Sequence, residues 1–324
     1  MKKLLTLLGT IGAIGLVQAF GVHAQDYPSR PVKIVVPYAA GGSTDILTRI
    51  IAQRLTARVG QSVLVENKPG ANGVIGTEAV VRSTADAYTL LMMTNGQTIS
   101  VGLVAKLPFD TEKDLVPIIN VGSMPNVILV HPSQPIKTIV DLIEYAKANS
   151  GKLSYSHAGV GSPQHLTGEL FKLVTKTNVV GVPYKGGGPA VADAVAGQVQ
   201  MVVAGVPAVS GHISSGRLRA LAVTSLNRSA LLADVPTVAE SGYPGFDANF
   251  WIALVGPRGM PNEAVQRLNS ELNAVLKDAE IGKQFASQGA SPVGGTPAQL
   301  GEFIKNDIAI WIRVIRDASI KVQD

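Results

Sequence analysis

Short β-branched runs alternate with amphipathic helical patterns along almost the whole chain, and this alternation limits the fold more than any other feature. The first unit is the strand-like run Val32–Val36, stopped by Pro37, with a following helical pattern that puts Leu47, Ile51 and Leu55 on one face. Strands joined by helices in this way form parallel sheets with helices on their faces. The sequence therefore predicts an α/β fold.

The same patterns divide the chain into two lobes. Strands are expected at 62–66, 88–93, 118–122, 127–130, 153–156, 179–183, 199–203, 218–223 and 250–255, with helices at 73–81, 139–148, 163–174, 189–196, 262–277 and 297–315. A chain of 324 residues is near the size at which one core splits into two. We expect lobe 1 to comprise 25–124 plus 248–324 and lobe 2 to comprise 125–247, with Met124 and Pro125 as the first crossover. The last two helices are expected to pack back on lobe 1.

The N-terminus has the pattern of an export signal. Lys2 and Lys3 precede the uncharged, mostly apolar Leu4–Phe20, and Val22–Ala24 then supplies small residues at positions −3 and −1 of a cleavage site. A membrane anchor is the alternative, but the run is shorter than the ~20 residues that span a bilayer. We therefore predict that residues 1–24 are a cleaved signal peptide and that the mature protein is exported.

Composition excludes several classes of function. The net charge is only +5, from 28 basic and 23 acidic residues spread along the chain, so no basic stripe for nucleic acid is present. The chain contains no cysteine, which excludes a lipoprotein anchor and disulfides and makes a structural zinc site improbable. No pair of histidines has metal-ligand spacing, so we expect neither a metal nor another cofactor.

A glycine-containing loop after the first strand is the first candidate binding element. Gly41 and Gly42 lack a Cβ, so they can take unusual φ values and let a ligand approach the backbone. Ser43 or Thr44 is expected to cap the next helix, with Asp45 in its first turn. Because a helix N-terminus offers unpaired N–H groups and partial positive charge, this junction suits a carboxylate. The alternative is a tight turn needed only for packing.

A second junction, at residues 156–165, repeats the arrangement in lobe 2. Ser162 is a good N-cap residue, and Pro163 suits the first helical position because its missing N–H would have no partner there. Two such helix N-termini on facing lobes could hold two ends of one anion without Arg or Lys. His165 could instead be a core or surface histidine, and Tyr184, at the end of a later strand, could face the ligand or pack in the core.

Enzyme interpretations find little support. The chain has no Gly-x-Ser-x-Gly elbow, and a hydrolase built on Ser162 and His165 would lack a third group to orient the imidazole. Residues 185–189 lack the Gly-Lys-Ser/Thr ending of a phosphate loop, and residues 159–161 lack the third glycine of a dinucleotide-binding turn. The chain is therefore not expected to be an enzyme.

Several long motifs resemble one family of receptors. They are Tyr27–Tyr38 with Gly41, Gly42 and Asp45, then Val65–Ala71, Gly159–Ser162 with His165 and Leu166, Val182–Gly186, and Asp234–Gly242 followed by Trp251. Together they resemble the tripartite tricarboxylate transporter receptors, the TctC or Bordetella uptake gene (Bug) family, over essentially the whole mature chain. The resemblance implies a type II periplasmic-binding-protein-like Venus flytrap of two α/β lobes with two crossovers.

The resemblance also implies a function and a site. A monomeric receptor would capture a small organic carboxylate, a di- or tricarboxylate or an aromatic acid, and deliver it to the membrane permease; presenting the ligand to a sensor kinase is the alternative. The expected ligand-binding residues are Tyr38, Ala39, Gly41, Gly42, Ser43, Asp45, Thr94, Asn95, Ala158, Gly159, Gly161, Ser162, His165, Tyr184 and Gly205. The chain departs from the common family pattern at His157–Ala158 and at Gln200 with Ala204–Gly205, which leaves the ligand's identity open.

Overall fold

The computed structural model describes residues 27–321, so the predicted signal peptide at 1–24 lies outside the described residues. The elements, in chain order, are β1 (Val32–Val36), α1 (Ser43–Val59), β2 (Val63–Asn67), η1 (Ala71–Gly73), α2 (Val74–Val81), β3 (Thr89–Thr94), α3 (Asn95–Leu103), β4 (Leu115–Val130), α4 (Ile139–Ala148), β5 (Ser154–His157), α5 (Pro163–Thr175), β6 (Val180–Pro183), α6 (Gly187–Val195), β7 (Met201–Gly205), α7 (Val206–Ser214), β8 (Arg219–Val223), η2 (Ala230–Leu232), β9 (Asn249–Pro257), α8 (Asn262–Leu276), α9 (Ala279–Ser287), β10 (Ser291–Gly294) and α10 (Pro297–Asp317).

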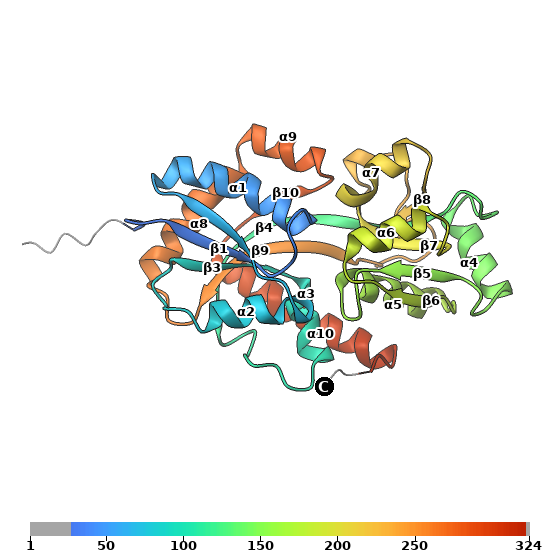
Figure 1. Ribbon diagram of the computed structural model, residues 1–324, viewed down its shortest axis with the longest axis horizontal. Helices are drawn as coiled ribbons and strands as arrows, with labels where there is room; N and C mark the ends of the chain where they lie inside the picture. Colours follow the sequence, from blue (N-terminus) through green and yellow to red (C-terminus); the bar gives the residue numbers. More distant parts are fainter. Residues whose placement is uncertain (1–26, 322–324) are drawn as a thin grey trace, which may run out of the picture.

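Two sheets form the two lobes, and the long strand β4 belongs to both (Figure 1). The lobe 1 sheet has the order β2-β1-β3-β9-β4, with β10 also paired to β4. From Asn126 onward β4 pairs instead with β7 and β8, and β7 continues the lobe 2 sheet through β5 to β6. The chain therefore passes between the lobes within one unbroken strand, whose partners change after Pro125, beside the expected crossover at Met124 and Pro125.

The sheets are mixed, whereas the sequence pattern predicted parallel ones. Strands β1, β2 and β3 are parallel, as are β5, β6 and β7, in agreement with the prediction. Strand β9 is antiparallel to both β3 and β4, and β4 is antiparallel to β7 and β8. The exceptions arise because β4 leaves lobe 1 and β9 returns to it, so these two strands run in opposite directions between the lobes.

Helices cover both faces of each sheet. In lobe 1, one face packs against α1 and α8 through residues such as Leu47 and Leu268, and the other packs against α2 and α10 through Val80 and Ile304. Lobe 2 likewise has one apolar cluster beneath α4 and α5 and another beneath α6 and α7. The strands therefore alternate between two cores, and their ends carry the loops that could form a binding site.

The C-terminal helix α10 joins the lobes instead of packing on lobe 1 alone. Its first half packs on the lobe 1 sheet, whereas Trp311, Val314 and Ile315 belong to the lobe 2 core together with Ile99 and Leu103 of α3. The helix can reach both because 21 residues of α-helix extend roughly 30 Å. Helix α8 thus packs on lobe 1 as expected, whereas α10 packs on both lobes.

Besides the short 3₁₀ helices η1 and η2, the sequence patterns missed α3, α7, α9 and β10. Two of them, α3 and α7, follow directly from the ends of β3 and β7 and so position residues near the candidate site. Between residues 27 and 321, no helix is both long and apolar enough to cross a membrane.

Candidate functional site

The loop between β1 and α1 is held in shape by the carboxylate of Asp45. Its Oδ2 accepts a hydrogen bond from the Gly41 amide at 2.9 Å, and its Oδ1 accepts one from Asn67 Nδ2 at 2.9 Å. Arg49 Nε donates to both oxygens at 3.0 Å. Asp45 therefore ties the loop to both β2 and its own helix. From its position in the first turn, the sequence analysis expected it only to interact with the helix dipole.

The helix cap differs from the prediction. The N-cap of α1 is Gly42, no side chain caps the helix, and neither Ser43 nor Thr44 fills that role. Only Gly41 has a positive φ, at 79°, whereas Gly42 lies at −78°, a value open to any residue. The Gly41 amide donates to Asp45, and the first-turn amides of α1 have no intrahelical partner, as at the start of any α-helix.

The ionised form of Asp45 is favoured by its partners. Burial by itself would raise the pKa, but the hydrogen bonds from Arg49, the Gly41 amide and Asn67 outweigh it, and the pKa of Asp45 is lowered from its ordinary value. The carboxylate is therefore charged at neutral pH and keeps its acceptor role. A second anion at this helix end would need other donors, because Asp45 already occupies the Gly41 amide.

Tyr38 connects this loop to the N-terminus of α3. Its hydroxyl lies 2.9 Å from Thr94 Oγ1, and its carbonyl accepts from Asn67 Nδ2 at 3.1 Å. Thr94 caps α3 in a reciprocal capping box with Gln97. Tyr38 and Thr94, predicted from separate segments, are thus brought together, and burial is the main reason that the pKa of Tyr38 is raised.

Asn95, the first residue of α3, is almost fully buried and faces the second crossover. Its Nδ2 donates to the carbonyl of Asn249 at 3.1 Å, at the start of β9. Its Oδ1 has no hydrogen-bond partner among the described residues. Asn95 therefore links α3 to the strand on which the lobes would turn, in addition to standing close to Thr94 and the candidate site.

The lobe 2 loop, residues 158–162, is built on two glycines with positive φ. Gly159 lies at 125° and Gly161 at 79°, and the Gly159 carbonyl accepts from the Ser162 amide at 3.1 Å. Ser162 is the N-cap of α5, as predicted, because its Oγ accepts from the amide of His165 at 3.2 Å. Ala158 lies in the same loop and is partly exposed.

Of the two remaining lobe 2 candidates, Tyr184 directly follows β6 and Gly205 ends β7. The Tyr184 hydroxyl donates to Asp193 of α6 at 2.8 Å, so its side chain is tied to a helix and not packed in the core. Gly205 is buried at the N-terminus of α7, where a Cβ would lie 3.5 Å from Ser43 Oγ of lobe 1. Ser43 and Gly205 are thus close across the lobes, and Ala39 lies exposed in the same lobe 1 loop.

The lobes also meet at two residues that the sequence analysis did not single out. Asn72 Nδ2 donates to the Gly161 carbonyl at 2.7 Å, and a Cβ on Gly161 would lie 2.3 Å from Leu103 Cδ2. Asn72 takes a left-handed φ of 51°, which Asn tolerates better than most residues. An Asn within the turn-rich segment 67–73 was the available signal, but nothing in the sequence showed that it would face lobe 2.

We expect Asn72→Ala to weaken ligand binding by about tenfold or less, because it removes one hydrogen bond that joins the lobes, a contribution of ~0.5–1.5 kcal/mol. Isothermal titration calorimetry with a ligand acid checks the expectation. Asn178→Ala is a suitable control, since the Asn178 side chain bonds only the exposed Ser150 within lobe 2 and should leave affinity unchanged. Equal affinities for wild type and Asn72→Ala would show that this bond makes no contribution to closure.

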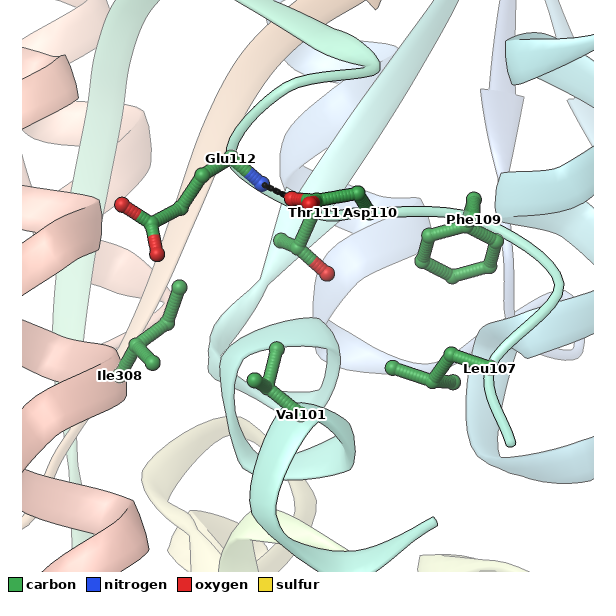
Figure 2. Close-up of a pocket in the computed structure, with 7 residues that line it drawn as sticks. All are labelled: Val101, Leu107, Phe109, Asp110, Thr111, Glu112 and Ile308. Atoms are coloured by element: carbon green, nitrogen blue, oxygen red, sulfur yellow. Dashed lines mark hydrogen bonds between the residues drawn. The ribbon is translucent and has the colours of Figure 1, made fainter. Parts of the chain in front are cut away.

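A separate cavity of about 290 Å³ lies on lobe 1 (Figure 2). Its walls are Val101, Leu107, Phe109, Asp110, Thr111, Glu112 and Ile308, from α3, the following loop and α10. None of the predicted ligand-binding residues belongs to this set. The candidate loops described above therefore lie outside this cavity.

Comparison with known proteins identifies the family. The model for the tripartite tricarboxylate transporter family receptor, TctC, matches residues 47–320. The chain belongs to this TctC receptor family. Protein BugT of Bordetella pertussis is 40% identical over 325 residues, covering 100% of this chain and 99% of the relative. The family recognised from the sequence motifs is thus confirmed, and it is a family of receptors and not of enzymes.

Solved TctC-type structures share the fold closely. An R. palustris protein described as being with adipate has a TM-score of 0.86 and 36% identity, covering 91% of this chain and 99% of that one. The periplasmic binding protein BugD has a TM-score of 0.84 and 35% identity, with coverages of 92% and 100%. MatC from Rhodopseudomonas palustris, with bound malate, has a TM-score of 0.81 and 29% identity, with coverages of 89% and 100%. These structures confirm the two-lobed periplasmic-binding-protein-like fold.

Proposed function

We propose that this TctC receptor binds a small organic carboxylate in the periplasm, between its two lobes, and delivers it to a tripartite tricarboxylate-type permease. The proposed moving units are residues 25–124 with 248–324 and residues 125–247. The observation that carries the proposal is the meeting of the helix N-termini of α1 and α7, where Ser43 and Gly205 lie close across the lobes. The loop before α5 joins the same contact through the bond between Gly161 and Asn72.

The chemistry of these loops fits an acid. Neither the 37–43 loop nor the 158–162 loop contains Lys or Arg, so backbone amides and hydroxyls are the donors available there. Amides at helix N-termini favour negative charge because the helix dipole adds a partial positive charge to unpaired N–H groups. Donors on two lobes would bind the two ends of one anion, and that anion would stabilise the closed form selectively.

The fifteen residues predicted from the sequence are proposed to form the site, some by contacting the ligand and others by holding the loops in shape. Ser43, Thr94, Ala158 and Gly205 stand at helix starts or in loops where their backbone or hydroxyl groups can contact a ligand. Asp45 and Gly161 hold the loops in shape, because their hydrogen bonds are made within the protein. The adipate and malate in the related structures support a dicarboxylate as the first ligand to test.

Transport is favoured over presentation to a sensor kinase. The family to which the chain belongs is described by its transporter, and none of the relatives and structures named above carries a signalling partner in its description. Loss of uptake of the bound acid after deletion of the gene would support the transport role. Normal uptake with loss of an acid-induced transcriptional response would support the sensor role instead.

We expect the ligand-stripped mature protein to be stabilised against heat by an organic acid and not by the corresponding amide. A ligand at ~100 times its Kd adds ~2.7 kcal/mol to the free energy of unfolding, which a thermal shift assay detects readily. The panel should contain adipate, malate and citrate, aromatic acids, and adipamide and malamide as neutral controls. Stabilisation by an amide alone, or by no acid at all, would contradict the carboxylate proposal.

A further inference from the structure

Two histidines stack beneath the lobe 2 loop. His157 ends β5 and His165 lies in the first turn of α5, and their ring centroids are 4.5 Å apart with an interplanar angle of 29°. His157 is 1% exposed, and the side chain of His165 is 12% exposed. The pair therefore spans the base of the 158–162 loop, with one ring before it and the other after it.

Each ring is hydrogen-bonded to one glycine of the loop. Gly161 donates its amide to His165 Nδ1 at 3.2 Å, and His157 Nδ1 lies 2.9 Å from the Gly159 carbonyl. His165 Nδ1 can accept this bond only when it carries no proton, so its proton must be on Nε2. An imidazolium has N–H groups on both nitrogens and could not accept the Gly161 amide.

The surroundings keep both rings uncharged. Glu169 Oε1 is 3.9 Å from His165 Nε2, but it also accepts from the Tyr155 hydroxyl at 2.9 Å and from Lys172 Nζ at 2.8 Å. Burial is the main cause that lowers the pKa of His165, with a smaller contribution from Lys172, and the attraction of Glu169 does not reverse it. Burial and the neighbouring His165 lower the pKa of His157 to about 3.

We propose that His165, supported by His157, is a positioning residue that fixes Gly161 through its Nδ1 lone pair and so sets the shape in which the lobe 2 loop meets lobe 1. The inference rests on the proposed binding function, but it assigns His165 a role without direct contact with the ligand. The Gly161 carbonyl can then face Asn72, because the Gly161 amide is fixed by its hydrogen bond to His165 Nδ1.

Replacement of His165 by two amides of different length tests the role of Nδ1. Asn places its amide group near the position of Nδ1, whereas Gln places it near Nε2. We expect His165→Asn to bind adipate, or whichever acid the panel identifies, within about threefold of wild type, and His165→Gln and His165→Ala to raise the Kd about tenfold or more. Equal losses in His165→Asn and His165→Gln, or no loss in any variant, would overturn the proposal.

A measurement without ligand keeps the inference separate from the proposed function. In the ¹⁵N-labelled wild-type protein, the ring nitrogens of His165 should show the Nε2–H form at neutral pH.

Because both histidine pKa values are lowered, the folded loop should be intact above pH ~6.5, where an unfolded histidine is neutral, and should lose stability as the pH falls below it. The amide signals of Gly159 and Gly161 should move together with the rings. Titration of His165 near pH 6.5 without any change at the two glycines would overturn the proposal.

Discussion

Gly161→Ala is expected to raise the Kd for the ligand by about 10- to 100-fold while the protein remains folded. A methyl group at this position would lie 2.3 Å from Leu103 Cδ2, so the lobes could not come together without moving one of them. Overpacking of this kind costs ~1–3 kcal/mol, and we expect the cost to fall on the closed form, because Gly161 lies in the lobe 2 loop and Leu103 on the lobe 1 helix α3, whose side chains pack against lobe 2. Calorimetry for affinity and circular dichroism for folding would measure the two effects separately.

Two further variants distinguish the clash from backbone strain. Gly216 has a φ of 70°, close to the 79° of Gly161, and a Cβ there would meet no atom within 4 Å. Gly216→Ala should therefore cost stability without changing affinity. Leu103→Ala, combined with Gly161→Ala, should recover part of the lost affinity because it removes the atom that clashes. Equal affinity losses in Gly161→Ala and Gly216→Ala, or no recovery in the double variant, would mean that the contact does not limit closure.

Asp45→Ala is expected to lower the affinity about 100-fold and to destabilise the protein by ~2–3 kcal/mol. The change leaves the Gly41 amide and Asn67 Nδ2 without their acceptor, and a hydrogen bond to a charged group contributes ~1.5–3 kcal/mol. Since the pKa of Asp45 is lowered, its stabilisation is complete above pH ~4 and is lost as the pH falls through the folded-state pKa. Urea unfolding of wild type and variant between pH 3 and pH 7 measures both effects.

Arg49→Gln provides the matched control for Asp45. Its guanidinium bonds the same carboxylate, but the Arg49 side chain is 52% exposed, so solvent screens the pair and the loss should stay below ~1 kcal/mol. The pH dependence should also remain in Arg49→Gln, because Gly41 and Asn67 still donate to Asp45. If Asp45→Ala weakened binding no more than Arg49→Gln, the loop would not depend on the carboxylate.

Elements with clear local signals were predictable from the sequence. The helix 139–148 has the predicted bounds because its apolar periodicity matches a real division between core and solvent, and the strand 32–36 has them because a buried β-branched run ends at Pro37. Helix α3 was missed for the opposite reason. Its segment, Asn95–Leu103, is buried along most of its length and contains Gly96 and Gly102, so it has neither a polar face nor a strong helix propensity.

The interrupted appearance of β4 also has a physical explanation. Pro117, Gly122 and Pro125 divide its apolar residues into short runs, which the sequence analysis took for two strands. In the structure the pairing with β9 shifts register between Pro117 and Ile119 and again between Asn120 and Gly122. These irregularities accommodate residues that disfavour a regular ladder, and the strand continues because both lobes supply neighbours for it.

The candidate loops were predictable, but their partners were not. Glycines after strands and Ser162 before Pro163 indicated the two junctions, because turns and helix caps depend on the residue types at neighbouring positions. The contact of Asn72 with Gly161 depends on which surfaces the fold brings together, whereas His165 reaches the Gly161 amide from only four residues along the chain. Contacts between residues 89 positions apart, as for Asn72 and Gly161, leave no pattern in a single sequence.

The position of β9 between β3 and β4 fixes when lobe 1 can be completed during synthesis. Its sheet contains a gap until residues 249–257 have been made, although β1, β2 and β3 emerge much earlier. Lobe 2 is formed by one continuous stretch of sequence, but its core also contains Trp311, Val314 and Ile315, which are made later. Neither lobe can therefore finish folding before residues 249–257 and 311–315 have been made, so until then the unfinished protein stays accessible to chaperones.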